Sequence, residues 1–254
     1  EDDKPYIEGP VVNGGSTNDN QPTISGTGGN SGEKVVIYDN GVKIGEADVN
    51  PDGSWSFTPG LGKELNDGPH HVEATNVDAA GNESAKSNPF EFTVDTQAPT
   101  QATTIEGVYD NVAADGSVLA TAEKIGNGGY TNDTTPQLRG TLSDGLNAGE
   151  KVVILRDGAV IGEATVDGTG TGWSFDDAGL ADGKTYIYTA RVEDQAGNRG
   201  GVSSDYLVHV DTSEPSQTVV ITTVWDDVAP GIGDVANNGT TNDSQPELRG
   251  TLSS

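Results

Sequence analysis

The sequence predicts an all-β chain, built as tandem antiparallel β-sandwiches arranged end to end. Two observations carry this prediction. An eleven-residue motif, TNDTTPQLRGT at residues 131–141, recurs as TNDNQPTISGT at 17–27 and as TNDSQPELRGT at 241–251. Between the copies, short β-branched and aromatic segments alternate with turn dipeptides, and no segment has the 3.6-residue period of a helix. Intervals this long between copies are typical of whole domains that repeat.

The repeat divides the chain into three parts. We predict a first domain at 1–97 that lacks its first strand, a complete second domain at 98–214, and the first two strands of a third repeat at 215–254. Proline, which is common at linkers, closes the first two parts in Ala98-Pro99 and Glu214-Pro215. The chain contains no Met, so we expect a piece taken from inside a longer protein.

Charge and composition exclude several classes of function. The net charge of −27 comes from 40 acids and 13 bases. Nucleic acid and anionic membrane both require a basic face, so neither is expected as a direct partner. No apolar run is long enough to span a membrane, and the absence of Cys excludes disulfides and thiolate chemistry. The acids either solvate the surface or bind a hard cation, and their positions decide between the two.

Two hairpins are predicted at equivalent positions of the two domains. Residues 32–47 (GEKVVIYDNGVKIGEA) closely match residues 149–164 (GEKVVILRDGAVIGEA). Their Val-Val-Ile cores are β-branched strand segments. The dipeptides Asn40-Gly41 and Asp157-Gly158 are those that a two-residue type I′ turn requires.

Aromatic residues in alternation mark the core. Trp55 and Phe57, like Trp173 and Phe175, fall on one face of a strand. Such a pair could form a sugar platform, but the chain offers few other large side chains to bury, so core packing is favoured. A longer strand follows, and its inward positions are predicted to be His70, Val72 and Ala74 in one domain and Tyr186, Tyr188, Ala190 and Val192 in the other. His70 then replaces a core Tyr and is no catalytic base.

Each complete unit therefore has seven predicted strands, as in an Ig-like sandwich. In the second domain the first, second, sixth and seventh strands are expected at 103–109, 137–142, 186–194 and 206–210. The motifs DAAGN at 78–82, VDTQAP at 94–99 and DGSWSF at 52–57, together with the repeated TND motif, resemble bacterial Ig-like repeats of giant secreted adhesins. These include the biofilm-associated and type I-secreted adhesins of Gram-negative bacteria. The resemblance covers nearly the whole chain, and it implies a long extracellular stalk that binds calcium, often at domain junctions.

The predicted topology gathers acids at the poles of the domains. Strands alternate in direction, so the loop after the first strand lies at the same pole as the end of the seventh. The loop after the sixth strand lies at the opposite pole and faces the preceding domain. The first junction is expected to collect Asp3, Asp19, Asp95 and Asp194, with Asp2 and Asp144 close by. The second is expected to collect Asp110, Asn111, Asp133 and Asp211, and Asp78 is the first-domain counterpart of Asp194.

Converging carboxylates repel unless a cation joins them, and Ca²⁺ accepts six to eight oxygens in flexible geometry. Calcium is therefore the expected cofactor. Any one of these acid pairs alone would more simply be turn chemistry. No EF-hand loop is present, so a site would have to be assembled from several loops.

The expected function is structural and not enzymatic. The chain is expected to be calcium-stiffened stalk repeats of a large secreted bacterial surface adhesin that mediates cell adhesion and biofilm formation. Its expected partners are the neighbouring repeats, while other parts of the parent protein would contact a host or biofilm surface. One alternative is a glycan- or protein-binding tip module that uses the loop 142–150, although this loop has no aromatic residue. A hydrolase with paired carboxylates is another, but no apolar pocket is evident to raise the pKa of one acid.

The end of the chain repeats the strand that the first domain lacks. Residues 217–225 correspond to a first strand and residues 245–252 to a second. An isolated pair of strands is marginally stable in water. The tail is either mobile or held by its linker, or it adds its first strand to the first domain of a neighbouring molecule.

Overall fold

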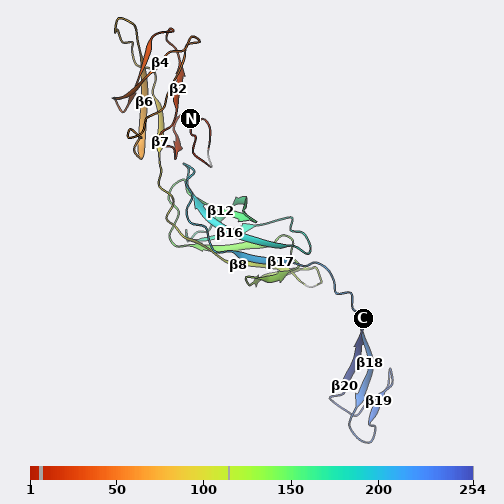
Figure 1. Cartoon of the computed structure of the whole chain (residues 1–254). Helices are drawn as coiled ribbons and strands as arrows, with labels where there is room; N and C mark the ends of the chain where they lie inside the picture. Colours follow the sequence, from red (N-terminus) through yellow and green to blue (C-terminus); the bar gives the residue numbers. More distant parts are fainter. Residues whose placement is uncertain (6–7, 114, 254) are drawn as a thin grey trace. The chain divides into compact units, whose positions relative to one another are not determined.

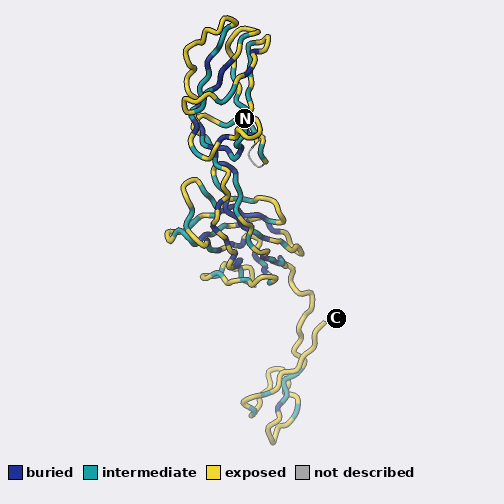
Figure 2. The backbone as a smooth tube through the Cα atoms, turned by 60° about the vertical axis from the view of Figure 1, so that its left-hand side comes forward, coloured by how far each residue is buried: buried dark blue, intermediate teal, exposed yellow. Residues whose placement is uncertain are grey.

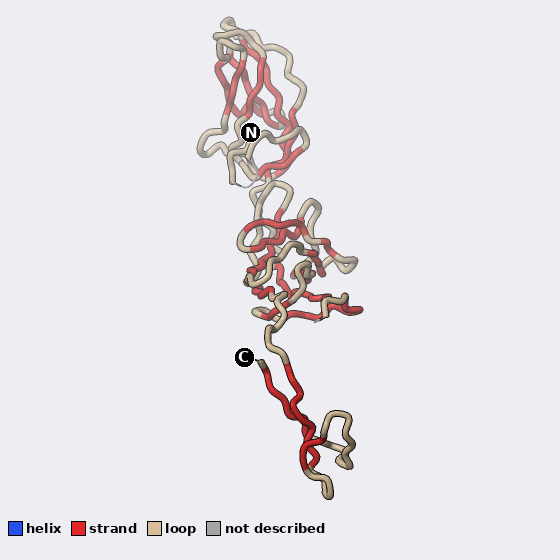
Figure 3. Tube along the Cα trace, turned by 90° about the vertical axis from the view of Figure 1, so that its right-hand side faces the viewer, coloured by secondary structure: helices blue, strands red, loops and turns tan. Residues whose placement is uncertain are grey.

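Short apolar segments separated by turns form strands throughout the computed structural model, which describes residues 1–5, 8–113 and 115–253. This part of the chain contains twenty strands and no helix (Figure 3). Contacts divide the chain into two units, residues 1–211 and 212–254. The first unit holds two sandwiches, which we name domain 1 (β1–β7) and domain 2 (β8–β17). The second unit holds β18–β20 and is named the C-terminal unit (Figure 1).

Domain 1 contains a five-stranded sheet in the order β1-β7-β6-β3-β4 and a two-stranded sheet that pairs β2 with β5. The strands are β1 (Gly15–Thr17), β2 (Ile24–Thr27), β3 (Lys34–Asp39), β4 (Val42–Asp48), β5 (Ser54–Phe57), β6 (Gly68–Val77) and β7 (Phe90–Val94). The core lies between the two sheets. It includes Val35, Ile37, Val72, Phe92 and Val94, with Trp55 and Phe57 packed against them.

Domain 2 has two five-stranded sheets, β10-β17-β16-β12-β13 and β14-β15-β11-β8-β9. The strands are β8 (Thr103–Val112), β9 (Val118–Ile125), β10 (Gly129–Thr131), β11 (Gln137–Leu142), β12 (Lys151–Arg156), β13 (Ala159–Glu163), β14 (Thr165–Val166), β15 (Gly172–Asp176), β16 (Thr185–Glu193) and β17 (Tyr206–Val210). The core contains Ile105, Val108, Leu138, Trp173 and Tyr188, with Phe175 packed against it. The all-β sandwich prediction is confirmed.

The predicted inward face of the long strand is also confirmed. Val72 and His70 are buried in domain 1, and Tyr188, Ala190 and Val192 are buried in domain 2. The alternation that placed these residues inside is the side-chain period of a strand, in which successive residues point to opposite faces. His70 therefore lies where a core residue was expected.

Both predicted hairpins form. The turn residues have positive φ throughout: Asn40 at 49°, Gly41 at 80°, Asp157 at 53° and Gly158 at 80°. The strands pair directly across two residues, Asp39 with Val42 in domain 1 and Arg156 with Ala159 in domain 2. Positive φ at both central positions defines the type I′ turn, whose twist matches that of the strands.

One feature of the sheets was not predicted. β1 pairs with β7 in parallel, Thr17 lying opposite Val94, and β10 pairs with β17 in parallel, Thr131 lying opposite Val210. The residues just before each Asn-Asp turn thus join the sheet of the last strand, and those just after it join the opposite sheet. The repeated motif is the point at which the chain crosses between sheets.

The C-terminal unit is a single sheet in the order β19-β18-β20, with β18 at Val219–Asp226, β19 at Gly233–Val235 and β20 at Glu247–Leu252. Both core clusters of the described residues belong to the first unit. Most of the C-terminal unit is exposed (Figure 2). Ile221 is 64% exposed and Leu248 is 65% exposed. This sheet therefore has no second layer to cover its apolar side chains.

Candidate functional site

In domain 2 a threonine hydroxyl joins the buried carboxylate of one aspartate to the backbone of a second buried aspartate. The Thr131 hydroxyl donates to Asp110 Oδ2 at 2.6 Å and accepts from the backbone N–H of Asp133 at 3.0 Å. Asp110 Oδ1 accepts from the N–H of Val112 at 2.7 Å, and Asp133 Oδ1 accepts from the N–H of Thr135 at 2.7 Å. Asp110 is 7% exposed and Asp133 is 1% exposed. We name this arrangement the Asp–Thr–Asp link.

Domain 1 contains the same link. Thr17 donates to Asp2 Oδ2 at 2.6 Å and accepts from the N–H of Asp19 at 3.1 Å. The N–H of Lys4 donates to Asp2 at 2.8 Å, and that of Gln21 donates to Asp19 at 2.9 Å. Asp2 and Asp19 are buried. The link ties the start of each repeat to the Thr-Asn-Asp turn, so it is set by the repeated sequence itself.

The C-terminal unit contains a third copy. Thr241 donates to Asp226 Oδ2 at 2.6 Å, and the N–H of Asp243 donates to Thr241 at 2.9 Å. The Thr241 hydroxyl bond, followed by the N–H of Val228, lowers the pKa of Asp226. Donors aimed at a carboxylate favour its ionised form. The same hydrogen-bond arrangement thus recurs at the same place in each repeat.

These buried carboxylates have little positive charge near them. Within the described residues, no ion pair involves Asp110 or Asp133, and the one basic side chain at the domain 1 link is Lys4, 3.7 Å from Asp19. Two acceptor oxygens beside the links, Asn18 Oδ1 and Asp243 Oδ2, are buried without a hydrogen-bond partner. Buried charge is costly unless it is paired or coordinates a metal. A donor set of carboxylate and amide oxygens suits Ca²⁺, so the residues fit this ion.

The structure does not, however, gather a ready-made metal cluster. No group of three or more His, Asp or Glu side chains that could hold a metal is present in the part of the chain that the structure describes. The predicted ligands Asp3 and Asn111 are exposed, and their backbone N–H groups, not their side chains, donate to Asp19 at 3.5 Å and Asp133 at 3.3 Å. A cation at a link would depend on two carboxylates together with amide and carbonyl oxygens.

The ends of the last strands lie beside the links. The N–H of Asp95 donates to Thr17 O at 2.9 Å, and the N–H of Asp211 donates to Thr131 O at 2.9 Å. The backbone of each of these aspartates is therefore hydrogen-bonded to the backbone of the threonine of a link. The structure brings Asp2, Asp19 and Asp95 into one neighbourhood, and Asp110, Asp133 and Asp211 into another.

Asn198, which was not predicted as a site residue, connects Asp194 to Asp95 by two hydrogen bonds. Asn198 Nδ2 donates to Asp194 Oδ2 at 2.8 Å and to the carbonyl oxygen of Asp95 at 2.7 Å. Asn198 closes the turn Asp194–Asn198, whose counterpart in domain 1 is Asp78–Asn82. The bond joins this turn of domain 2 to the segment that follows β7.

The two turns differ in burial although their sequences correspond. Ala196 is 1% exposed, whereas its counterpart Ala80 is exposed. A Cβ added at Gly200 would meet Pro99 O at 2.9 Å, which shows how closely the linker passes. The residues that follow domain 1 thus pass close to this part of domain 2. Within one chain, the central Ala of the turn is buried in domain 2 and exposed in domain 1.

Two acids of the predicted set remain apart from the links. Asp78 is bonded within its own turn, to Asn82 Nδ2 at 2.8 Å and to the N–H of Ala80 at 2.9 Å. The Asn82 side chain and N–H lower the pKa of Asp78. Asp144 is exposed and accepts from the N–H of Gly145. Turn chemistry accounts for the positions of both.

Sequence reasoning missed a buried polar cluster in domain 2. Asp177, 6% exposed, accepts from Arg156 at 2.8 Å and from the Tyr188 hydroxyl at 2.6 Å. Burial, followed by the hydrogen bond to Asp177, raises the pKa of Tyr188. Domain 1 has a different pair near the corresponding strands, with His70 Nδ1 2.7 Å from Asp39 Oδ2. The aspartates of the two clusters stand at positions that do not correspond, since Asp39 lies where Arg156 lies in domain 2. Comparison of the repeats therefore could not reveal the clusters.

Several solved structures of bacterial adhesins are similar to this chain. A bacterial ice-binding adhesin retained at a host cell surface is 21% identical, with a TM-score of 0.28, over 80% of this chain and 61% of its own. A tetra-tandem repeat from the extending region of a large adhesion protein is 21% identical, with a TM-score of 0.29, over 93% of this chain and 64% of its own. A Ca²⁺-stabilised adhesin with which an Antarctic bacterium binds ice is 24% identical, with a TM-score of 0.34, over 82% of this chain and 49% of its own. The alignments thus span less than two thirds of those chains.

The family assignment rests on a sequence model and not on these superpositions. No curated protein sequence matches the chain. None of the described residues forms a helix that is long and apolar enough to cross a membrane.

The model of the bacterial Ig-like domain matches residues 9–96 and again residues 114–212. Since these two matches take in well over half of the chain, the protein belongs to the bacterial Ig-like domain family.

Proposed function

We propose that this chain is a stretch of stalk repeats from a large secreted bacterial adhesin and that it has a structural, not a catalytic, role. The observation that carries the proposal is the docking of the linker on the turn of domain 2. Asn198 holds the carbonyl of Asp95, and Ala196 of the same turn is buried, whereas Ala80 in the corresponding turn of domain 1 is exposed. A repeat that binds the end of the preceding repeat restricts bending between the two, which is what a spacer needs.

Calcium is the proposed cofactor at the junctions. The proposed ligands are Asp2, Asp3, Asp19, Asp95 and Asp194 at the first junction and Asp110, Asn111, Asp133 and Asp211 at the second, with Asp78 in the corresponding turn of domain 1. The ion would neutralise the buried carboxylates of each Asp–Thr–Asp link, which have few basic partners. In this way it would stabilise the pole at which one repeat ends and the next begins.

The proposed setting is the bacterial cell surface. There the repeats would hold other parts of the parent protein away from the cell so that those parts can contact a host or biofilm surface. The partners of this stretch are the neighbouring repeats, and adhesion and biofilm formation are functions of the whole protein. The net charge of −27 supports partners other than nucleic acid and anionic membrane.

A calcium titration followed by calorimetry, thermal unfolding and small-angle scattering tests the proposal. At calcium 100-fold above Kd, each site adds about 2.7 kcal/mol to the free energy of unfolding. A domain of this size gains roughly 4–8 °C in Tm for each kcal/mol. Asp133→Asn should reduce the calcium response of domain 2, whereas Asp115→Asn, in an exposed turn of the same domain, should not.

The two parts of the proposal can fail separately. Identical melting in calcium and in chelator would refute the metal. Scattering that shows freely hinged domains with calcium present would refute the stiff stalk. Mg²⁺ at the same concentration serves as a control, because it demands a tight octahedron that loop oxygens rarely supply.

A further inference from the structure

His70 lies between two hydrogen-bond acceptors near the start of β6. Its Nδ1 is 2.7 Å from Asp39 Oδ2, at the end of β3, and its Nε2 is 2.8 Å from the carbonyl oxygen of Asn66, in the loop before β6. A neutral imidazole carries one N–H and can donate only one of these bonds, whereas an imidazolium carries two. Both contacts are therefore hydrogen bonds only when the ring is doubly protonated.

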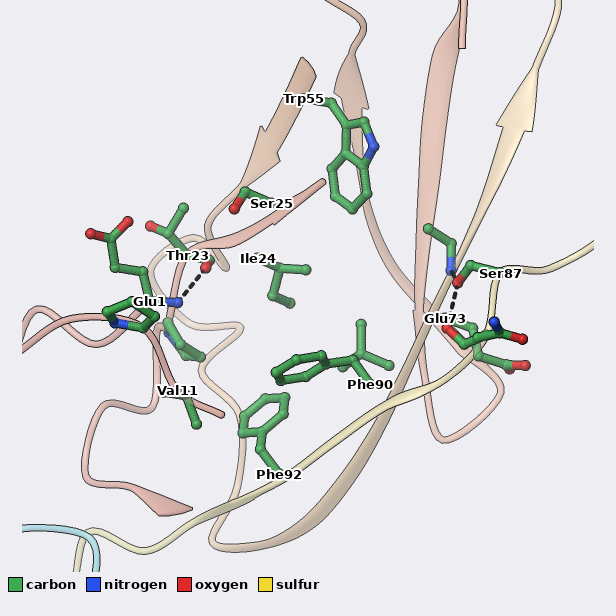
Figure 4. Close-up of a pocket in the computed structure, with 15 residues that line it drawn as sticks. Glu1, Val11, Thr23, Ile24, Ser25, Trp55, Glu73, Ser87, Phe90 and Phe92 are labelled. Carbon is green, nitrogen blue, oxygen red and sulfur yellow. Dashed lines mark hydrogen bonds between the residues drawn. The ribbon is translucent and has the colours of Figure 1, made fainter. Parts of the chain in front are cut away.

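The strands packed around His70 suit a positively charged ring. β3 places the Asp39 carboxylate against it, and the second oxygen of that carboxylate accepts from the N–H of His71 at 3.2 Å. From β7, the core residue Phe92 (Figure 4) stacks on the imidazole, with the ring centroids 5.3 Å apart. The acid of β7, Glu91, faces His71 instead, with Oε1 3.4 Å from Nδ1. Because His70 is buried, its charge is paired with one carboxylate largely out of water.

The loop that His70 holds also holds the linker. Asp67, which follows Asn66 in this loop, accepts from the N–H of Thr96 at 3.0 Å and from its hydroxyl at 2.8 Å. Its other oxygen accepts from Gln97 Nε2 at 3.1 Å. The Thr96 hydroxyl, followed by the N–H, lowers the pKa of Asp67. This carboxylate therefore stays ionised near neutral pH, whereas the charge of a histidine ordinarily changes between pH 5 and 8.

Loss of a proton from His70 breaks one particular bond. A hydrogen bond to a carboxylate is stronger than one to a neutral carbonyl, so the proton that remains stays on Nδ1, opposite Asp39. The bare Nε2 then faces the carbonyl oxygen of Asn66 at 2.8 Å, and two acceptors at that distance repel each other. The loop before β6 moves away from the ring, and Asp67 moves with it.

Domain 2 makes the corresponding contact without a charged ring. There Tyr186 replaces His70, and its hydroxyl accepts from the N–H of Ala181 at 2.9 Å. Arg156, which stands in the place of Asp39, lies over the Tyr186 ring, 5.3 Å from its centroid. Since the loop of domain 2 offers a donor and the phenol oxygen accepts it, this contact needs no change of charge. The dependence on a proton is a feature of domain 1.

We propose that His70 is a pH-sensitive switch that sets how firmly domain 1 holds the linker that follows it. As an imidazolium it fixes the loop at Asn66, and Asp67 of that loop anchors Thr96 and Gln97. As pH rises and the ring loses a proton, the loop is released and the anchor loosens. The anchored arrangement binds one proton more than the released one, so it is favoured at low pH and lost as pH rises.

Hydrogen exchange of the Thr96 amide in the full chain, measured by NMR at pH 5 and pH 8, tests the proposal. Each rate is divided by that of an unfolded peptide at the same pH, which gives a protection factor. Weakening of one hydrogen bond should lower this factor by about five-fold from pH 5 to pH 8. His70→Gln should abolish the pH dependence, because its amide does not titrate. His71→Gln is the matched control, since this neighbour points to the opposite face of β6, and it should keep the pH dependence of the parent.

A second measurement on the parent chain does not depend on the folding of a variant. The nitrogen-15 shifts of the His70 ring report the protonation of each nitrogen as pH rises, and Nε2 should lose its proton while Nδ1 keeps it. The amide signals of Asn66, Asp67 and Thr96 should shift with the same midpoint as the ring. Equal protection of Thr96 at pH 5 and pH 8, a pH dependence that survives in His70→Gln, or loop amides that do not follow the His70 ring would overturn the proposal.

Discussion

The side-chain amide of Asn198 bridges two repeats, donating at 2.7 Å to the carbonyl oxygen of Asp95 and at 2.8 Å to the carboxylate of Asp194. Both protons of the amide nitrogen are thereby used. One bond shapes the turn of domain 2 and the other holds the end of domain 1. Asn82 makes the first bond, to Asp78, and has no described counterpart of the second.

Replacing Asn198 by Ala should release the linker. One net hydrogen bond is worth about 1 kcal/mol, so we expect faster amide exchange in the linker 96–99 and easier proteolysis there. Hydrogen exchange read by mass spectrometry measures the change. Asn82→Ala is the matched control, because it opens the equivalent turn without touching the linker. If both variants raise exchange in the linker equally, the bridge does not restrain it.

Replacing Thr131 by Val should destabilise domain 2. The change keeps the shape of the side chain but removes the donor to Asp110 and the acceptor of the Asp133 N–H. Leaving buried polar groups unpaired costs about 1–3 kcal/mol. Urea unfolding measures this loss, and Thr131→Ser, which keeps the hydroxyl, should recover most of it. Equal stability of the Val and Ser variants would show that the hydroxyl contributes nothing.

Replacing Gly140 by Ala should cost more than the same change at Gly26. A Cβ at Gly140 would lie 2.1 Å from Thr104 O, a backbone atom, and 2.2 Å from the Trp173 ring. The three atoms nearest to a Cβ at Gly26 all belong to the Trp55 side chain, the first at 2.5 Å. Overpacking typically costs about 1–3 kcal/mol, and a side chain can shift more easily than the backbone of a neighbouring strand. Calorimetry of both variants checks the order, and a larger loss for Gly26→Ala would contradict it.

Domain 2 should lose stability in alkali through Tyr188. Burial and the bond to Asp177 raise the pKa of this phenol above its value in the unfolded chain, near 10. Above that pH the unfolded state releases the proton first, so this contribution is complete below about pH 10 and falls as pH rises, by up to about 1.4 kcal/mol per pH unit. Unfolding of the parent and of Tyr188→Phe from pH 8 to pH 11 measures the slope. The variant should start less stable and decline less steeply, and parallel slopes would exclude Tyr188 as the source.

Much of the fold was predictable because its signals are local and occur twice. The hairpins at Asn40-Gly41 and Asp157-Gly158 follow from dipeptides that tolerate positive φ. The second and seventh strands of domain 2 begin and end where the alternation placed them, at Gln137–Leu142 and Tyr206–Val210. The parallel pairs β1–β7 and β10–β17 were not predictable in this way, because they depend on where the chain crosses between sheets.

The candidate site was predicted in part. Its aspartates were predicted from their recurrence, and hydrogen bonds through Thr17 and Thr131 connect Asp2, Asp19 and Asp95 in domain 1 and Asp110, Asp133 and Asp211 in domain 2. The threonine that joins them is the first residue of the repeated motif, but nothing in the sequence separates a bridging hydroxyl from an ordinary strand residue. Asn198 belongs to a turn motif whose obvious role is to cap its own Asp194. Its second bond becomes visible only when the linker is in place.

The parallel pairing of β10 with β17 also determines how domain 2 would respond to a pulling force. A load applied to the N-terminal side of β10 and the C-terminal side of β17 would slide the two strands past each other along their length. All hydrogen bonds from Gly129–Val208 to Thr131–Val210 would then share the load at once instead of opening one by one. Resistance to such a pull is governed by the unfolding rate and not by the equilibrium free energy. A parallel pair of this kind can therefore resist a pull on its two strands even where the equilibrium free energy of unfolding is small.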